Sequence, residues 1–203
     1  MKKLSPADYR SMPWKNGAGT TIEIAVFPEH AKLEDFIWRV SRAQVVSDGG
    51  FSHFAGIDRS LALLQGSGMR LSVNEFSLKV DAENNIAIFA GDAATHAELI
   101  NGAISDFNLM SRRSICSHKL NHWVGAATRQ LPVGAVLLYC AQGSGQLRGK
   151  NTTYDLDLHE DETLQFSSTE EVNEYTLHST AGSSFYCVQI TMNGDSNANS
   201  TVG

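Results

Sequence analysis

The chain has 203 residues, of which 42% are hydrophobic and 19% are charged, a composition typical of a folded globular protein. This length allows one large β domain or two small ones, and the composition excludes a disordered or fibrous chain. The formal net charge of −6 argues against a protein that binds the phosphate backbone of nucleic acids through a basic face, but it allows a local basic pocket.

The first residues and the cysteines indicate a cytoplasmic protein. Met1–Asp8 carries two lysines with no apolar stretch after them, so we predict no signal peptide. No apolar run approaches the roughly 20 residues that span a bilayer, so no membrane partner is expected. Cys116, Cys140 and Cys187 lie far apart and form no Cys-x-x-Cys motif, which predicts buried free thiols in a reducing compartment.

Residues 5–8 predict a short helical turn, and the stretch that follows it carries unusual side chains. Trp14 supplies a flat apolar wall, Lys15 a charge, and Asn16 both donors and acceptors. Gly17 and Gly19 come next and permit close approach of a ligand or of another backbone segment. We interpret the stretch as one wall of a pocket for a small anionic molecule. The alternative is a tight turn entering a sheet, with Trp14 in the core and Lys15 in water.

Short apolar or alternating runs separated by Asn and Gly predict strands almost throughout, and helical periodicity is nearly absent. In the first half these runs are Thr20–Phe27, Phe36–Val46, Ser60–Leu64, Met69–Val73, Phe76–Val80, Ile86–Phe89, Ala97–Ile100 and Ile104–Met110. In the second half they are Ala135–Cys140, Tyr154–Leu158, Thr163–Phe166, Glu174–Leu177 and Phe185–Thr191. The pattern predicts an all-β sandwich or barrel, with a turn over residues 47–50.

The strand over Phe36–Val46 places Arg39 on a largely apolar face, together with Ser41, Ala43 and Val45. An unpaired buried guanidinium is very unfavourable, so Arg39 needs a partner. That partner is either a carboxylate of the protein or the anionic group of a ligand.

An internal repeat divides the chain. Leu64-Gln65-Gly66-Ser67-Gly68 returns as Ala141-Gln142-Gly143-Ser144-Gly145, and an apolar strand precedes each copy. The offset is 77 residues, from Gly66 to Gly143. Two copies of one β unit explain this pattern, although Gly-Ser-Gly turns are also common in unrelated β proteins. We predict an N-terminal half over residues 1–113, a C-terminal half over 114–192 and a disordered tail over 193–203.

Motifs for metal or nucleophilic chemistry are weak. His118 and His122 are four residues apart, but the segment around them is predicted to be extended, where this spacing separates them by more than about 10 Å. The chain contains no His-x-His, no Gly-x-Ser-x-Gly and no P-loop pattern. We therefore expect no metal ion, no cofactor and no catalytic nucleophile.

The strand near residue 108 has a mixed face. Asp106, Asn108, Met110 and Arg112 alternate onto one side, which is unusual for a core and for a solvent face. We interpret this face as a second wall of the pocket, opposite Lys15. The alternative is an edge strand with a solvated outer face.

These stretches together resemble the HutD/Ves family. The resemblance is carried by Met12-Pro13-Trp14-Lys15-Asn16-Gly17-x-Gly19, Trp38-Arg39-x-Ser41-x-Ala43, Gly50-Phe51-Ser52-x-Phe54-x-Gly56-x-Asp58-Arg59 and Asp106-Phe107-Asn108-Leu109-Met110. The chain departs from the family pattern at Ala18, where a third glycine is common. The resemblance implies a bicupin: two cupin-like β-barrel or jelly-roll halves in one chain.

The resemblance also implies a function connected with histidine utilisation or stress response: metal-free, non-enzymatic binding and regulation by a small acidic metabolite such as urocanate or formylglutamate. Its ligand-binding residues would comprise cations for the carboxylate, rings over the apolar part and two asparagines for orientation. They are Trp14, Lys15, Asn16, Arg39, Phe51, Arg59, Asn108 and Arg112. Arg59 has an alternative partner in its neighbour Asp58 or another acid.

The competing hypothesis is a metal-independent cupin lyase, isomerase or hydrolase acting on a small carboxylic acid, with Lys15 or His53 moving the proton. A third is a structural β protein with an incidental cleft. Whether the protein is a homodimer is left open by the sequence.

Overall fold

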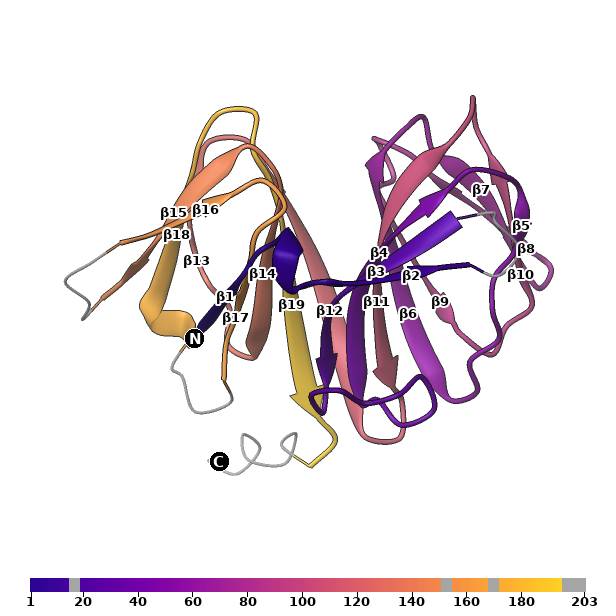
Figure 1. Cartoon of the computed structure of the whole chain (residues 1–203), viewed down its shortest axis with the longest axis horizontal. Coiled ribbons are helices and arrows are strands. Elements are labelled where there is room, and N and C mark those ends of the chain that lie inside the picture. The colour runs from indigo at the N-terminus through magenta and orange to yellow at the C-terminus, as the bar shows by residue number, and fades with distance from the viewer. Residues whose placement is uncertain (15–18, 151–154, 168–171, 195–203) are drawn as a thin grey trace, which may run out of the picture. The chain divides into compact units, whose positions relative to one another are not determined.

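We describe a computed structural model of the chain over residues 1–14, 19–150, 155–167 and 172–194. The chain divides into two compact units. The N-terminal unit is Tyr9–Ser117, and the C-terminal unit combines Met1–Asp8 with His118–Gly203 (Figure 1). The boundary after Ser117 lies near the expected one, but Met1–Asp8 joins the second half.

The N-terminal unit consists of a six-stranded and a four-stranded sheet. The larger sheet has the order β2 (Arg10–Pro13), β3 (Gly19–Phe27), β4 (Trp38–Val45), β11 (Ile104–Arg112), β6 (Ile57–Gln65), β9 (Ile86–Ala90). The smaller sheet has the order β5 (Gly49–Gly50), β10 (Thr95–Leu99), β7 (Met69–Val73), β8 (Phe76–Val80). The turn expected over residues 47–50 is wrong in its second half, because Gly49 and Gly50 pair with β10.

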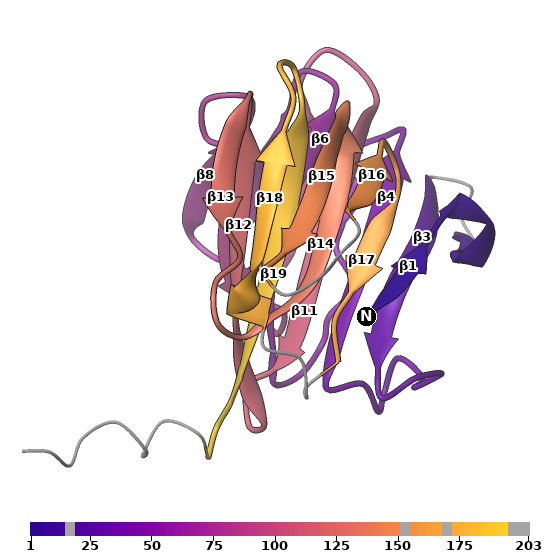
Figure 2. The same ribbon diagram turned by 90° about the vertical axis from the view of Figure 1, so that its left-hand side faces the viewer.

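The C-terminal unit has the same two-sheet plan. Its five-stranded sheet has the order β1 (Lys2–Leu4), β17 (Thr163–Gln165), β14 (Ala135–Gln142), β19 (Ser184–Met192), β12 (Cys116–Val124). Its four-stranded sheet has the order β13 (Ala127–Gln130), β18 (Tyr175–Ser179), β15 (Ser144–Gly149), β16 (Leu156–His159). Figure 2 shows β1 beside β17, and this pairing is why the first residues belong here.

Alternating side chains give each unit its core. In β7, Met69, Leu71 and Val73 are buried, while the residues between them are exposed. They pack with residues of the opposite sheet, including Leu61 and Phe89, in one apolar cluster. The C-terminal unit has its own cluster, which also draws on both of its sheets. The strand assignments made from the sequence are therefore confirmed within a few residues at their ends.

The short helices are 3-10 turns, η1 (Pro6–Asp8) and η2 (Val172–Glu174). The predicted turn over residues 5–8 is confirmed as η1, where the Asp8 carboxylate accepts from the Ser5 backbone N–H at 2.8 Å. None of the helices in the described part of the chain has the length and apolar character needed to cross a bilayer.

The repeat has a structural counterpart in the two units. Strand β6 lies between β11 and β9, and β14 lies between β19 and β17. The turns that follow β6 and β14 place Gly66 and Gly143, the residues related by the repeat, at positive φ angles of 99° and 73°. The two halves are thus copies of one β arrangement.

Candidate functional site

A cavity of about 670 Å³ lies in the N-terminal unit, against the inner face of its larger sheet. The walls are formed by the end of β2, by β4, β6 and β11, by residues 47–52 and by Phe54. Among the predicted ligand-binding residues, the lining includes Trp14, Arg39, Phe51, Arg59 and Asn108. The predicted Lys15 and Asn16 lie outside the described residues.

The strand register explains why distant residues meet at this cavity. Across the sheet, Met110 of β11 has Arg39 of β4 on one side and Arg59 of β6 on the other. In the next pair along the same face, Asn108 lies opposite Ser41. Directly opposed residues of neighbouring strands point to the same side of a sheet, so these polar groups share one face. Because β11 has neighbours on both sides, the edge-strand interpretation is wrong.

Arg39 is paired within the protein. Its Nε donates to Glu23 Oε2 at 2.6 Å, and its Nη1 donates to Ser41 Oγ at 3.3 Å. Only 5% of the Arg39 surface is exposed. Glu23 therefore supplies the partner that the sequence required, and the two charges cancel beside the cavity.

Arg59 lies in an aromatic cage. Its guanidinium carbon is 4.7 Å from the ring centre of Phe51, 5.2 Å from that of Phe89 and 6.0 Å from that of Phe54. The residue is only 3% exposed, and its Nε has no hydrogen-bond partner among the described residues. Burial lowers the pKa of Arg59 to about 10, opposed by the charge of Asp106, so the guanidinium stays protonated at neutral pH. Arg59 therefore has a full counter-charge only when Asp106 is ionised.

Of the two alternative partners considered for Arg59, its neighbour Asp58 or another acid, the structure leaves the second: the charge of Asp106 acts on Arg59, and Asp58 pairs elsewhere. Successive residues of a strand point to opposite faces, so the Asp58 side chain cannot follow Arg59 into the cavity. Asp58 instead accepts from Arg113, at 2.7 Å.

Asp106 is the functional candidate that was absent from the predicted site list. It lines the cavity with 1% of its surface exposed, and its Oδ1 has no hydrogen-bond partner within the described part of the chain. Burial raises the pKa of this carboxyl to about 7, with Arg59 opposing the shift. The Oδ1 of Asn108 is likewise buried without a described partner. The sequence did signal both residues, through the alternation that places them on one face of β11.

Trp14 lines the cavity and also packs against the core, so features of both interpretations of this stretch are present. Its Nε1 donates to Thr21 Oγ1 at 2.8 Å, and its ring packs against the apolar core. Gly19 lies under this ring, and a Cβ atom there would collide with the carbonyl oxygen of Gln44. The glycine therefore allows close approach of a second backbone segment, one of the two roles expected for it. The predicted Gly17 lies outside the described residues.

Arg112 does not line the cavity. Its Nη2 donates to the carbonyl oxygen of Glu34 at 2.7 Å and its Nε to that of Phe36 at 3.0 Å, so it fastens the segment before β4. His53 is exposed and is not among the lining residues either. Neither residue supports the role assigned to it from the sequence.

The described residues contain no group of three or more His, Cys, Asp or Glu side chains that could hold a metal ion. His122 approaches Ser184, with 2.8 Å between Nε2 and Oγ, and its ring stacks on Tyr186. All three cysteines are buried and free, as predicted.

Comparison with known proteins shows the family to which the chain belongs. Residues 6–185 match the HutD family. The chain belongs to this family. An uncharacterized 21.2 kDa protein in the hutC 3′ region of Pseudomonas putida is 36% identical over 141 residues, 70% of this chain and 74% of that protein. Protein Ves of Citrobacter koseri is 37% identical over 153 residues, 73% of this chain and 78% of that protein.

Solved structures agree with this assignment. HutD from Pseudomonas fluorescens SBW25, described as the formate condition, has a TM-score of 0.78 at 29% identity, covering 95% of this chain and 99% of that one. A cupin 2 conserved barrel domain protein from Leptotrichia buccalis has a TM-score of 0.55 at 9% identity, covering 94% of this chain and 96% of that one. The second likeness shows the fold alone and supports the cupin jelly-roll arrangement. The predicted family and fold class are thus confirmed.

Among its described residues, the C-terminal unit shows apolar side chains at the positions that correspond to this polar face. Asp106 lies opposite Leu63 in the first unit, and Cys140, the repeat counterpart of Leu63, lies opposite Phe185. In the same way, Asn108 corresponds to Cys187. Phe185 and Cys187 are buried in the apolar core, so the cavity of the N-terminal unit is where polar groups gather.

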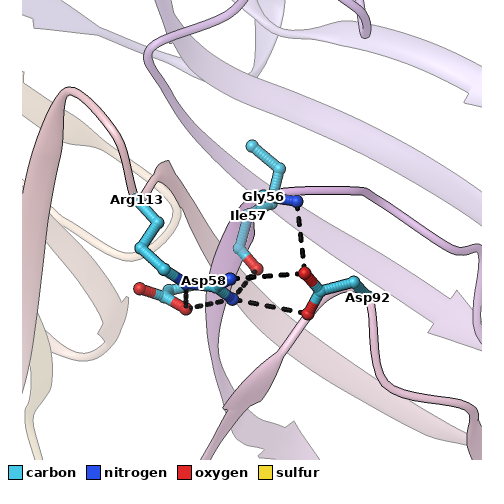
Figure 3. Close-up of polar contacts among 5 residues, drawn as sticks. All are labelled: Gly56, Ile57, Asp58, Asp92 and Arg113. Atoms are coloured by element: carbon cyan, nitrogen blue, oxygen red, sulfur yellow. Dashed lines mark hydrogen bonds and ion pairs between the residues drawn. The ribbon is translucent and has the colours of Figure 1, made fainter.

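An ion-pair cluster fixes the loop that carries Phe54 of the aromatic cage. Arg113 contacts Asp58 at 2.7 Å and Asp92 at 3.3 Å, and Asp92 accepts from the Gly56 backbone N–H at 3.3 Å (Figure 3). The Phe54 backbone N–H donates to the Gly91 carbonyl at 2.8 Å. The cluster therefore ties residues 54–56 to the turn after β9.

Replacing Arg113 by alanine is expected to loosen this loop, because the variant loses both ion pairs that Arg113 makes with Asp58 and Asp92. Hydrogen exchange of residues 51–57, measured by mass spectrometry, should become faster. Arg148→Ala is the matched control, since Arg148 lies in the other unit, 3.0 Å from Asp155. Unchanged exchange in Arg113→Ala would contradict this positioning role.

Proposed function

We propose that this protein is a non-enzymatic bicupin that binds a small carboxylate metabolite in the cavity of its N-terminal unit. The observation that carries the proposal is Arg59, a cation buried under three phenylalanine rings at the wall of a cavity. Burying a charge without a counter-charge is unfavourable, and an anionic ligand would remove that cost. The volume of about 670 Å³ falls in the range of small-molecule sites.

The remaining lining groups support a more specific ligand. Asn108 presents an acceptor oxygen without a described partner, which suits an N–H donor on the ligand. Trp14 and Phe51 offer apolar walls for the carbon skeleton. A carboxylate with an N–H group a few bonds away satisfies all three features. Urocanate, with its imidazole N–H, and N-formylglutamate, with its amide N–H, both have this chemistry.

Relatives support a role in histidine utilisation. One lies in the hutC 3′ region of Pseudomonas putida, and another is HutD of Pseudomonas fluorescens. We propose that the bound metabolite regulates this pathway and is not chemically changed by the protein.

The alternative function is that of an enzyme. One observation favours it: the Asp106 carboxyl has a pKa near 7 and can therefore exchange a proton at neutral pH.

Isothermal titration calorimetry with urocanate and N-formyl-L-glutamate tests the proposal, with urocanamide and formamide as neutral controls. We expect at least one acid to bind at micromolar to millimolar concentration and to raise the melting temperature, while the neutral compounds do neither. Failure of both acids to bind would overturn the proposal. The same mixtures should be followed by nuclear magnetic resonance, where conversion of either acid would favour the enzyme.

A further inference from the structure

Asp106 occupies a special place in the cavity. It lies on β11, between β4 and β6, opposite Ala43 on one side and Leu63 on the other. Its side chain is buried, and its Oδ1 has no hydrogen-bond partner among the described residues. A buried carboxyl oxygen without a partner is costly, and protonation or a donor from a ligand would relieve that cost.

Few charged groups face Asp106 from the elements packed around it. β6 contributes Arg59 and β4 contributes Arg39, which Glu23 of β3 neutralises. The segment before β5 contributes Asp48, whose Oδ1 accepts from the Leu99 backbone N–H at 2.7 Å. From β2, β5 and β10, the described lining residues are uncharged. The charge balance at the floor of the cavity therefore depends on Arg59 and Asp106.

The protonation state of Asp106 decides whether the cavity can accept an anion. With Asp106 ionised, Arg59 is already balanced, and an incoming carboxylate would bring two carboxylates together. With Asp106 protonated, the floor carries one positive charge, and the acid hydroxyl becomes a hydrogen-bond donor. A monoanionic carboxylate group then finds a cation and a donor side by side.

We infer that carboxylate binding at Arg59 is coupled to protonation of Asp106, so that the protein takes up a proton from solvent as it binds. No covalent bond changes, because the proton comes from water or buffer and returns when the ligand leaves. The inference rests on the proposed carboxylate site and adds a regulatory consequence: occupancy would fall as the medium becomes more alkaline.

The direction of the pH effect follows from burial, which raises the pKa of Asp106 to about 7 in the free protein. A bound anion raises this pKa further. Affinity is therefore constant well below pH 7 and falls by up to about tenfold per pH unit above it, until the pKa of the bound state is reached. Both carboxyls of N-formyl-L-glutamate stay ionised across this range, so the ligand adds no slope of its own.

The experiment is calorimetric titration of the intact protein with N-formyl-L-glutamate and with urocanate, between pH 6 and 9, in phosphate and in Tris. We expect the Kd to rise on the order of 10- to 100-fold between pH 7 and 9. The apparent binding enthalpy should differ between the two buffers, because the buffer releases the proton that the protein takes up and the two buffers have different ionisation enthalpies. Asp106→Asn should bind with a pH-independent affinity and no buffer dependence.

The possible failures are distinct. Binding with a flat pH profile and no proton uptake in the unaltered protein would overturn the coupling but leave the proposed function standing. No binding of either acid at any pH would overturn both. A readout without ligand also exists: since the pKa of Asp106 is raised in the folded protein, the stability of the unaltered protein relative to Asp106→Asn should fall as the pH rises from about 4 to 7. Equal slopes in the two proteins would contradict a neutral Asp106.

Discussion

Replacing Arg59 by methionine is expected to weaken carboxylate binding by at least about a hundredfold while leaving the N-terminal unit folded. Truncating one partner of a buried charge contact typically costs about 2–5 kcal/mol of binding free energy, and about 2.7 kcal/mol corresponds to a hundredfold change. Methionine fits the cage because its thioether packs well against the rings of Phe51 and Phe89. Without Arg59, the pKa of Asp106 loses the larger of the two influences that oppose its rise, and only the backbone hydrogen bond from Ala43 still favours the ionised carboxyl.

The matched control is Arg70→Met. Arg70 lies on β7 of the same unit, but its side chain is 57% exposed and 3.9 Å from Glu98. Calorimetric titration with both acids should give unaltered affinity for Arg70→Met and no measurable binding for Arg59→Met. Melting curves of the two variants should show one folded transition each. Retained affinity in Arg59→Met would remove the central cation from the proposal.

Local alternation made much of the candidate site predictable. The strand over Phe36–Val46 was expected to place Arg39 and Ser41 on one face, and the strand through Asn108 was expected to do the same for Asp106 and Met110. Both follow from the two-residue period of a strand, which needs no knowledge of the fold. The register of β4 and β11 then brings the two faces together. No local sequence pattern predicts how two strands about 60 residues apart pair, so only the structure shows the contact between the faces of β4 and β11.

The aromatic cage shows where prediction from sequence ends. Phe51 belongs to a stretch that the family resemblance had marked, but Phe89 lies on β9, whose alternation suggested only a buried strand. It reaches Arg59 because it is the register partner of that residue across the β6–β9 pair. The role of Arg113 was missed for a similar reason, since its partners Asp58 and Asp92 are 55 and 21 residues away.

Arg112 illustrates the opposite error. Its position in the alternation of β11 is the same as that of Asn108, so strand periodicity alone places it at the cavity. It lies at the end of the strand, however, beside a segment whose backbone carbonyls are open to a donor. Carbonyl oxygens at the end of an element need partners, and a guanidinium with five N–H groups supplies them. Strand periodicity predicts the side of the sheet to which a side chain points. At the end of a strand, however, neighbouring backbone groups without partners decide which atoms a long side chain contacts.

Replacing Glu23 by glutamine is expected to lower the free energy of unfolding of the N-terminal unit by about 3–5 kcal/mol, because it leaves the Arg39 guanidinium buried without its counter-charge. The side chains of Arg39 and Glu23 are only 6% and 12% exposed, so water cannot replace the lost carboxylate. Urea unfolding followed by tryptophan fluorescence measures the change. A Trp123→Phe background restricts the signal to Trp14 and Trp38, which both lie in this unit.

Three comparisons separate the ion pair from other causes of instability. Glu98→Gln removes an exposed partner 3.9 Å from Arg70 and should change stability by no more than about 1 kcal/mol. Adding Arg39→Met to Glu23→Gln should recover most of the loss, because no buried charge then remains unpaired. N-formyl-L-glutamate should stabilise Glu23→Gln more than the unaltered protein, since its carboxylate can replace the missing acid. Equal free energies of unfolding for Glu23→Gln and Glu98→Gln would show that the ion pair between Arg39 and Glu23 does not stabilise the unit. Arg39 would then be a second cation, beside Arg59, that is available to a ligand.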